Sequence, residues 1–323
     1  MGNRRIDVHT HYLGGTVARL FQSGFTLTGG YRMSAQWNAS AAIEFMDRHS
    51  IATQILSVPW AFTDPSGDPG FAGRFCRHVN EEYATLIRDH PDRFGAFAAI
   101  PANHPDDALA EIEYALDVLG LDGVLLSSNA AGNYFGGEFY APILAELAHR
   151  QVPAFVHPAE CPHIQVLGFG RPSSIIEFPC DTARTITDAI YSGVFQRHPE
   201  LTLILAHCGG VLPTLGWRIG EHTAMGRGPD DASIDAIDVA ATLRGLYYET
   251  ALAGSRNSLL PTLEVTAADH ILFGTDWPAA PEPTVVKNIA NLTSFTGWAD
   301  GDLAHVERAN AAKLFSRFKP AMA

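Results

Sequence analysis

The sequence predicts an α/β fold, specifically a (β/α)8 TIM barrel. The chain contains eight short runs rich in Val, Ile, Leu and Phe, and helical patterns recur between them. These runs do not alternate with polar residues, as expected for strands buried on both faces of a parallel sheet. Such barrels take ~250 residues, so a chain of 323 leaves a surplus for loops. The eight predicted strands are residues 5–9, 52–58, 94–100, 122–128, 153–158, 201–207, 246–250 and 270–276.

Helical spacing appears between these runs. Segment 40–49 opens with Ser40 as the predicted N-cap, and segment 105–119 begins with Pro-Asp-Asp and carries apolar residues on one face. The same spacing recurs in segments 139–149, 181–197 and 309–318. Strand followed by helix, repeated eight times, predicts the barrel.

Three long interruptions separate the predicted elements: 14–38, 158–180 and 221–240. Each of these segments is predicted to follow a strand. We therefore expect all three to be long βα loops over the active site, at the end of the barrel where catalytic residues lie. No internal repeat, low-complexity tract or linker divides the sequence, so residues 1–323 are predicted to form one domain.

Composition restricts the partners. The formal net charge of -13 and the absence of a basic patch argue against nucleic acid and anionic membranes. No apolar run approaches the length of a membrane span, and no charged-then-apolar leader is recognised. The four cysteines form no C-x-x-C pair, which is typical of a reduced, cytoplasmic protein.

Candidate reactive side chains fall at the ends of predicted strands. His9 and His11 end the first strand, His157 the fifth, His207 the sixth and Asp276 the eighth. In a chain with 14 His, chance alone gives about one-half of an H-x-H pair. His9 and His11 therefore indicate a metal site only if other ligand-type residues lie beside them. Strand ends meet at one rim of a barrel, and residues two apart on a strand point to the same face. Imidazoles with a carboxylate suit zinc or a similar divalent ion, with one position left open.

Structural interpretations of these residues stay open. His157 precedes a proline and His207 heads a Cys-Gly-Gly turn, so each can simply end a strand. Asp276 can cap the next helix, a common role for aspartate. His270 begins the eighth predicted strand, at the opposite end of the barrel, and is not a candidate ligand.

Five motifs together resemble the amidohydrolase-related decarboxylases of the aminocarboxymuconate-semialdehyde decarboxylase type. They are IDVHTHYL, FVHP, LILAHCGG, FGTDWP and ERANAAKLF, and they span residues 5 to about 318. The stretches DHPDRFGAFAAIP, LGLDGVLLSSN and EFPCDTARTITDAI are most similar to 6-methylsalicylate decarboxylases. The resemblance implies an amidohydrolase-like barrel with one divalent metal, zinc or else manganese. The implied ligands are His9, His11, His157 and Asp276, with His207 as the adjacent acid–base residue.

The positions of the lysines exclude one type of metal site. Many barrel hydrolases of the wider superfamily bridge two metals with a carbamylated lysine on the fourth strand. Here the fourth predicted strand reads GVLLSSN, and lysine occurs only at positions 287, 313 and 319. Composition therefore excludes a carbamate-bridged dinuclear site.

Two arginines also match the resembled family. Arg218 lies eleven residues after His207, at the spacing of an arginine that binds a substrate carboxylate across a dimer interface. Arg32 resembles a second carboxylate-binding arginine from the loop after the first strand. Either can instead be a surface or salt-bridged arginine. The resemblance implies a homodimer or a dimer-based tetramer.

These observations predict a metal-dependent, non-oxidative decarboxylase of a small aromatic acid, with an ortho-hydroxybenzoate such as 6-methylsalicylate as substrate. Asp276 is the predicted proton donor, with its protonation controlled by the metal and His207. The alternative on the same scaffold is a mononuclear metal-dependent hydrolase of a lactone or amide. A catalytically inactive barrel that works as a binding protein is a third hypothesis, which the intact ligand set argues against.

Overall fold

The computed structural model describes residues 5–22, 37–58, 70–222, 225 and 235–318. Its strands form one eight-stranded sheet in sequential order, in which each strand pairs in parallel with the next. The predicted barrel is confirmed. The strands are β1 Arg5–His11, β2 Ile51–Ser57, β3 Phe94–Ala98, β4 Gly123–Ser127, β5 Ala154–His157, β6 Leu203–Leu205, β7 Tyr247–Glu249 and β8 Ile271–Leu272.

Backbone hydrogen bonds between the first strand and the segment after β8 close the barrel. The amide of Val8 donates to the carbonyl of Phe273 at 3.0 Å, and the amide of Asp276 donates to the carbonyl of His9 at 2.8 Å. The amide of His11 donates to the carbonyl of Trp277 at 2.8 Å. Strand β8 is shorter than the predicted run 270–276, but its extension follows β1 and brings Asp276 beside the two histidines of that strand.

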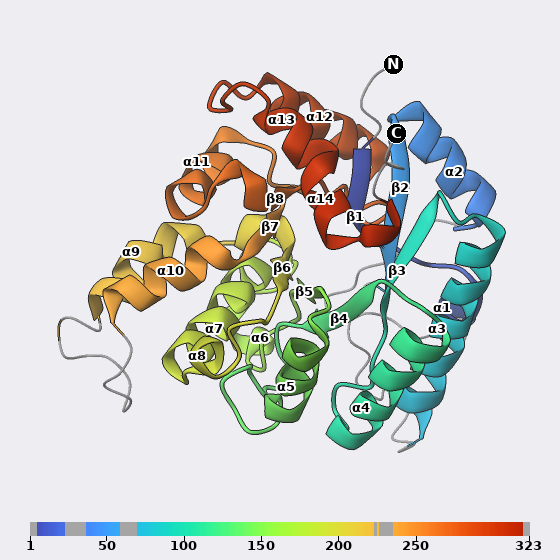
Figure 1. Ribbon diagram of the computed structural model, residues 1–323, viewed down its shortest axis with the longest axis horizontal. Coiled ribbons are helices and arrows are strands. Elements are labelled where there is room, and N and C mark those ends of the chain that lie inside the picture. Colours follow the sequence, from blue (N-terminus) through green and yellow to red (C-terminus); the bar gives the residue numbers. More distant parts are fainter. Residues whose placement is uncertain (1–4, 23–36, 59–69, 223–224, 226–234, 319–323) are drawn as a thin grey trace.

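Helices surround the strands, with α1, α2 and α3 on one side of the barrel and α9, α10 and α11 on the opposite side (Figure 1). Their bounds are α1 Gly15–Gln22, α2 Ala39–Arg48, α3 Phe71–Asp89, α4 Pro105–Glu113, α5 Ala141–Arg150, α6 Ile164–Leu167, α7 Glu177–Tyr191, α8 Val194–Arg197, α9 Leu212–His222, α10 Ala236–Gly245, α11 Arg256–Val265, α12 Glu282–Ser294, α13 Asp302–Ala304 and α14 Asn310–Leu314. None of the helices in these described ranges is long and apolar enough to cross a bilayer.

The predicted helices exist with shifted ends. Helix α2 is capped by Asn38, whose side-chain oxygen accepts from the amide of Ala41 at 2.9 Å, so Ser40 is not the cap. The predicted helix 181–197 starts earlier, at Glu177, and breaks into α7 and α8 at Gly193, where φ is 70°. A left-handed residue ends an α-helix, which is why a glycine stands at the break.

The expectation for segment 221–240 is wrong, because it does not follow a strand. It joins α9 to α10, and both helices lie between β6 and β7. Glycines in the α9 sequence conceal the helix, and packing explains their presence: a Cβ at Gly216 would approach Leu243 of α10 to 2.9 Å. The other two interruptions follow strands as predicted: 14–38 follows β1 and contains α1, and 158–180 follows β5 and contains α6.

Aromatic side chains fill the barrel beneath its carboxyl end. The rings of Phe97 and Phe155 stack with centroids 5.2 Å apart, and both side chains are completely buried. Burying a phenylalanine contributes about 1.5–3 kcal/mol. Phe155 also packs edge-on against the ring of His9, with centroids 4.9 Å apart. This apolar layer packs beneath the polar residues at the carboxyl end of the barrel and supports the His9 ring.

Candidate active site

Four predicted ligands meet at the carboxyl end of the barrel. His9 and His11 come from β1, His157 is the last residue of β5, and Asp276 follows β8. One ligand atom from each lies within 4.8 Å of the others, and all four residues are buried. Asp276 Oδ1 lies 2.9 Å from His11 Nε2 and 3.3 Å from His9 Nε2. This is a group of donors that could hold one metal ion.

Hydrogen bonds on the far side of the rings orient two of the imidazoles. His9 Nδ1 donates to Glu249 Oε1 at 2.7 Å, and His157 Nδ1 donates to the carbonyl of Pro158 at 2.9 Å. A proton on Nδ1 leaves the lone pair of Nε2 in a neutral imidazole. In that state both rings direct the Nε2 lone pair toward the cluster. Metal-binding histidines are fixed in the same way in other proteins.

Electrostatics favour this ligand set. Burial lowers the pKa of His11, and burial together with the neighbouring histidines lowers the pKa of His157 well below its usual value. Burial also acts to lower the pKa of His9, but Glu249 and Asp276 outweigh it and raise that pKa to about 10. Burial alone would raise the pKa of Asp276, yet His9 and His11 hold it well below its usual range. His11 and His157 therefore offer neutral imidazoles and Asp276 an ionised carboxylate, which suit a divalent cation. The raised pKa of His9 means that His9 would release a proton when a cation binds.

His207 lies beside the cluster but does not end a strand. It belongs to the turn Ala206–Gly209, with φ 55° and ψ 46°, and β6 ends earlier, at Leu205. Its Nδ1 donates to the carbonyl of Ala251 at 2.8 Å. Its ring centroid is 4.9 Å from that of His9 and 6.1 Å from that of His157. The prediction of its strand position is wrong, while its predicted proximity to the ligands matches the geometry.

Two buried carboxylates of the site were missed by the sequence analysis. Glu249, at the end of β7, contacts His9 and His207. Asp7, two residues before His9 on β1, accepts from Thr275 Oγ1 at 2.7 Å and from Gln54 Nε2 at 3.1 Å. Burial raises the pKa of Asp7 to about 7. The available signal was an acidic residue inside each of the predicted strands 5–9 and 246–250, where a buried charge needs partners.

The start of α7 lies over this end of the barrel. The ring of Phe178 packs edge-on against His157, with centroids 6.4 Å apart. Asp181, one turn further on, is fully buried and accepts from Ser128 and Asn129, which follow β4. These bonds attach α7 to the barrel beside the histidines.

Only one of the two predicted arginines, Arg218, falls in the described residues, and it is not part of the cluster. Arg218 is exposed on α9, the helix that follows the His207 turn. Arg32 lies outside the described residues. The carboxylate-binding roles of both arginines therefore stay predictions.

Comparison with known proteins identifies the family. The amidohydrolase family model matches residues 6–317. The chain belongs to the amidohydrolase family. The chain is 32% identical to 6-methylsalicylic acid decarboxylase acuB of Aspergillus aculeatus, over 99% of this chain and 98% of that protein. It is 29% identical to gamma-resorcylate decarboxylase of Rhizobium sp., over 84% of this chain and 85% of that one.

A solved structure agrees with these relatives. The crystal structure of 2,6-dihydroxybenzoate decarboxylase complexed with 2,6-dihydroxybenzoate superposes with a TM-score of 0.78 at 25% identity. The match covers 98% of this chain and 100% of that chain. The predicted resemblance to amidohydrolase-related decarboxylases is confirmed.

Proposed function

We propose that this protein is a metal-dependent, non-oxidative decarboxylase of an ortho-hydroxybenzoate, with 6-methylsalicylate as the leading substrate. The observation that carries the proposal is the buried cluster of three imidazoles and one carboxylate at the carboxyl end of the barrel. A relative that decarboxylates 6-methylsalicylic acid and aligns with 99% of the chain supports this substrate class. The whole chain, residues 1–323, is proposed to act as one catalytic domain.

The residues fit one divalent metal ion. His9, His11, His157 and Asp276 would hold it, because their donor atoms converge and the imidazoles of His9 and His157 have Nδ1 engaged elsewhere. Three nitrogen donors with one carboxylate favour zinc, with manganese as the alternative. When bound, the metal supplies a positive centre that holds the substrate carboxylate and ortho-hydroxyl.

Asp276 is proposed to move the proton. Its low pKa means that it meets the substrate ionised, so it first accepts the proton of the ortho-hydroxyl. It then delivers that proton to the ring carbon that bears the carboxylate, giving a dearomatised ketone. The bond from ring to carboxylate breaks, CO₂ leaves, and the electron pair restores the aromatic ring as a phenolate. His207, beside His9, is assigned to the control of Asp276 protonation, and the phenolate takes up a proton on release.

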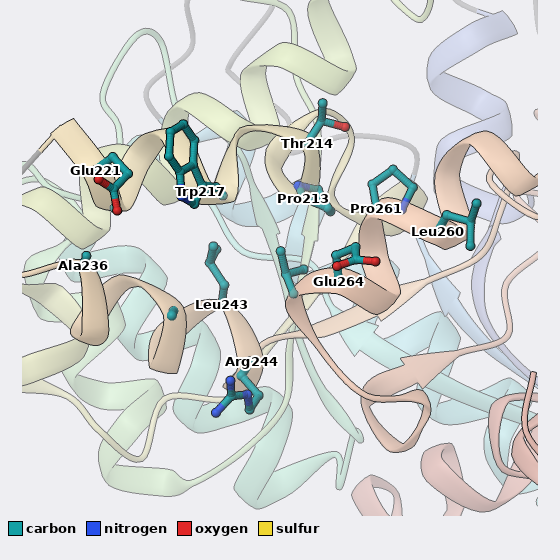
Figure 2. A pocket seen from close by; sticks show the side chains of 14 residues that line it. Pro213, Thr214, Trp217, Glu221, Ala236, Leu243, Arg244, Leu260, Pro261 and Glu264 are labelled. Atoms are coloured by element: carbon teal, nitrogen blue, oxygen red, sulfur yellow. The ribbon is translucent and has the colours of Figure 1, made fainter. Parts of the chain in front are cut away.

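The protein is further proposed to be a homodimer, or a tetramer built from dimers, in which Arg218 binds the carboxylate of the partner's substrate. Arg218 is exposed on α9 next to Trp217, whose side chain is 77% exposed. A groove of about 650 Å³ runs between α9, α10 and α11 beside it, and Figure 2 shows Trp217, Leu243 and Pro261 along its walls.

A second copy of the chain is the occupant that this surface favours. The groove is lined by acidic and basic side chains, Glu221 and Glu264 with Arg244, around an apolar centre. A two-fold interface brings the same patch from both subunits together, so a patch that carries both signs of charge can pair with itself. Trp217 supplies the large aromatic anchor that is enriched in such interfaces.

The compartment is proposed to be the reducing cytoplasm. All four cysteines lie in the described residues as free thiols, three of them buried. Free buried thiols are the usual state in reducing compartments.

The function is tested by product analysis with a panel of hydroxybenzoates and dihydroxybenzoates. We expect CO₂ and the matching phenol in equal amounts, with activity lost after metal removal and restored by zinc or manganese. No CO₂ from any ortho-hydroxybenzoate, together with hydrolysis of a lactone or amide panel, would contradict the proposal and favour the hydrolase.

A further inference from the structure

We propose that Glu249 is a positioning residue that fixes two groups at once, the imidazole of His9 and the backbone of His207. The inference rests on the proposed metal-dependent decarboxylation. It goes beyond that function by naming one buried carboxylate that couples metal binding to the acid–base residue.

A single oxygen joins the two groups. Glu249 Oε1 accepts from His9 Nδ1 at 2.7 Å and from the backbone amide of His207 at 2.6 Å. The other oxygen, Oε2, accepts from the amide of Ala251 at 2.7 Å. The carbonyl of Ala251 in turn accepts from His207 Nδ1 at 2.8 Å. The end of β7 therefore holds His207 by its amide and by its ring, and holds His9 by its ring.

The backbone at His207 needs this support. His207 and Cys208 have φ of 55° and 54°, and Gly209 and Gly210 follow with φ of 72° and 63°. A left-handed conformation is unfavourable for a residue with a Cβ. Such strain persists where the surroundings fix the conformation. The hydrogen bond from the His207 amide to the Glu249 carboxylate acts directly on this backbone, beside the bond from the His207 ring to the Ala251 carbonyl.

The charges at the centre balance when Glu249 is included. Glu249 is fully buried, and the described ion pairs of its carboxylate are with His9 at 2.7 Å and His207 at 4.0 Å. Isolated buried charge is unfavourable. Two buried carboxylates, Glu249 and Asp276, would carry the two negative charges that match one divalent ion when the histidines bind it as neutral imidazoles. Through its hydrogen bond to His9 Nδ1, the Glu249 carboxylate would orient His9 toward such an ion and make the imidazole a stronger donor.

Space for the carboxylate is made by a glycine of the FGTDWP motif. A Cβ at Gly274 would overlap the Glu249 carboxylate and approach His9 Cβ to 2.9 Å. Since the carboxylate is held by hydrogen bonds on both oxygens, it cannot move aside without losing them. Gly274→Ala should therefore displace the Glu249 carboxylate without removing its negative charge. Glu249→Gln removes the charge but keeps a side chain of nearly the same shape.

The experiment compares these two variants with Glu111→Gln. Glu111 is a matched control: it is also a buried glutamate and accepts from Asn80 Nδ2 at 2.8 Å and Arg77 Nε at 2.9 Å, on α4 outside the barrel. Zinc affinity is measured by competition with a chromophoric chelator, and kcat and KM are measured with saturating zinc. Circular dichroism checks folding.

We expect Glu249→Gln and Gly274→Ala to bind zinc about 10–100-fold more weakly than wild type. With saturating zinc, kcat should still fall at least about tenfold with a smaller change in KM, because His207 is no longer held. Glu111→Gln should keep both zinc affinity and kcat. If Glu249→Gln fails to fold, zinc affinity and kcat of Gly274→Ala still test the inference.

Two results would overturn the inference, and they are distinguishable. If wild type binds zinc and either folded variant keeps zinc affinity and kcat within about twofold, Glu249 positions neither group, and the proposed function stands. If wild type itself binds no divalent metal, the proposed function fails and this inference fails with it.

Discussion

Removing His157 should abolish stabilisation of the protein by metal. The side chain is 6% exposed, and its Nε2 is one of four converging donors. In wild type, zinc at about 100 times its Kd stabilises the folded state by about 2.7 kcal/mol. For a chain of this size, that corresponds to a rise in Tm of roughly 4 °C. Thermal unfolding of chelator-treated protein, with and without added zinc, measures this shift.

In His157→Ala the same zinc concentration should have almost no effect. If losing one of four donors weakens binding about 1,000-fold, zinc stands at about 0.1 Kd and stabilises by less than about 0.1 kcal/mol. The metal-free variant also loses packing against Phe155 and Phe178, at a cost of about 1–3 kcal/mol. The zinc-induced difference, and not the absolute Tm, is therefore the diagnostic quantity.

The matched control is His270→Ala. His270 stacks on Tyr247 with centroids 4.5 Å apart and pairs with Asp269, immediately before β8 and away from the cluster. This variant should lose some stability and keep the full zinc shift. A zinc shift in His157→Ala equal to that of wild type would refute the assignment of His157 as a ligand.

Three further predictions concern the proton donor, the assembly and the buried aspartate. Asp276→Asn should lower kcat by about 10²–10⁴-fold at saturating metal, measured as phenol formation, and a near-normal kcat would move the donor role to His207. Arg218→Ala mixed with Asp276→Asn after subunit exchange should regain part of the wild-type activity, because one site of a mixed dimer is then complete; inactive mixed dimers would count against an arginine that acts across the interface. The pKa of Asp7 is raised from 3.8 to about 7, so its carboxyl favours folding when protonated, and that contribution is lost as pH rises from 3.8 to about 7. Urea unfolding of metal-free protein should therefore show Asp7→Asn gaining stability relative to wild type across this pH window; a difference that does not change with pH would show that Asp7 does not titrate there.

The convergence of the four proposed ligands could be predicted because each of them ends, or closely follows, a strand that the sequence marks clearly. His9, His11 and His157 end apolar runs, and parallel strands in a barrel bring their carboxyl ends to one rim. Asp276 lies four residues beyond β8, yet backbone pairing with β1 places it beside them.

Glu249 and Asp7 could not be assigned in the same way. Both lie inside predicted strands. Their roles depend on which side chains face them from other strands, which the local sequence does not show. Glu249 meets His9 and the His207 turn only because β7, β1 and the end of β6 converge at this rim. Helix α9 was obscured by its glycines, which exist for contact with α10, a partner that local periodicity does not reveal.

The most direct test of the central claim is turnover of carboxyl-labelled 6-methylsalicylate in D₂O by zinc-loaded enzyme, followed by mass and NMR analysis. The account predicts labelled CO₂ and a phenol with one deuterium at the carbon that carried the carboxylate, in equal amounts, and neither product from chelator-treated enzyme. Unchanged substrate under the same conditions, labelled CO₂ without deuterium at that carbon, or full turnover without metal would contradict it.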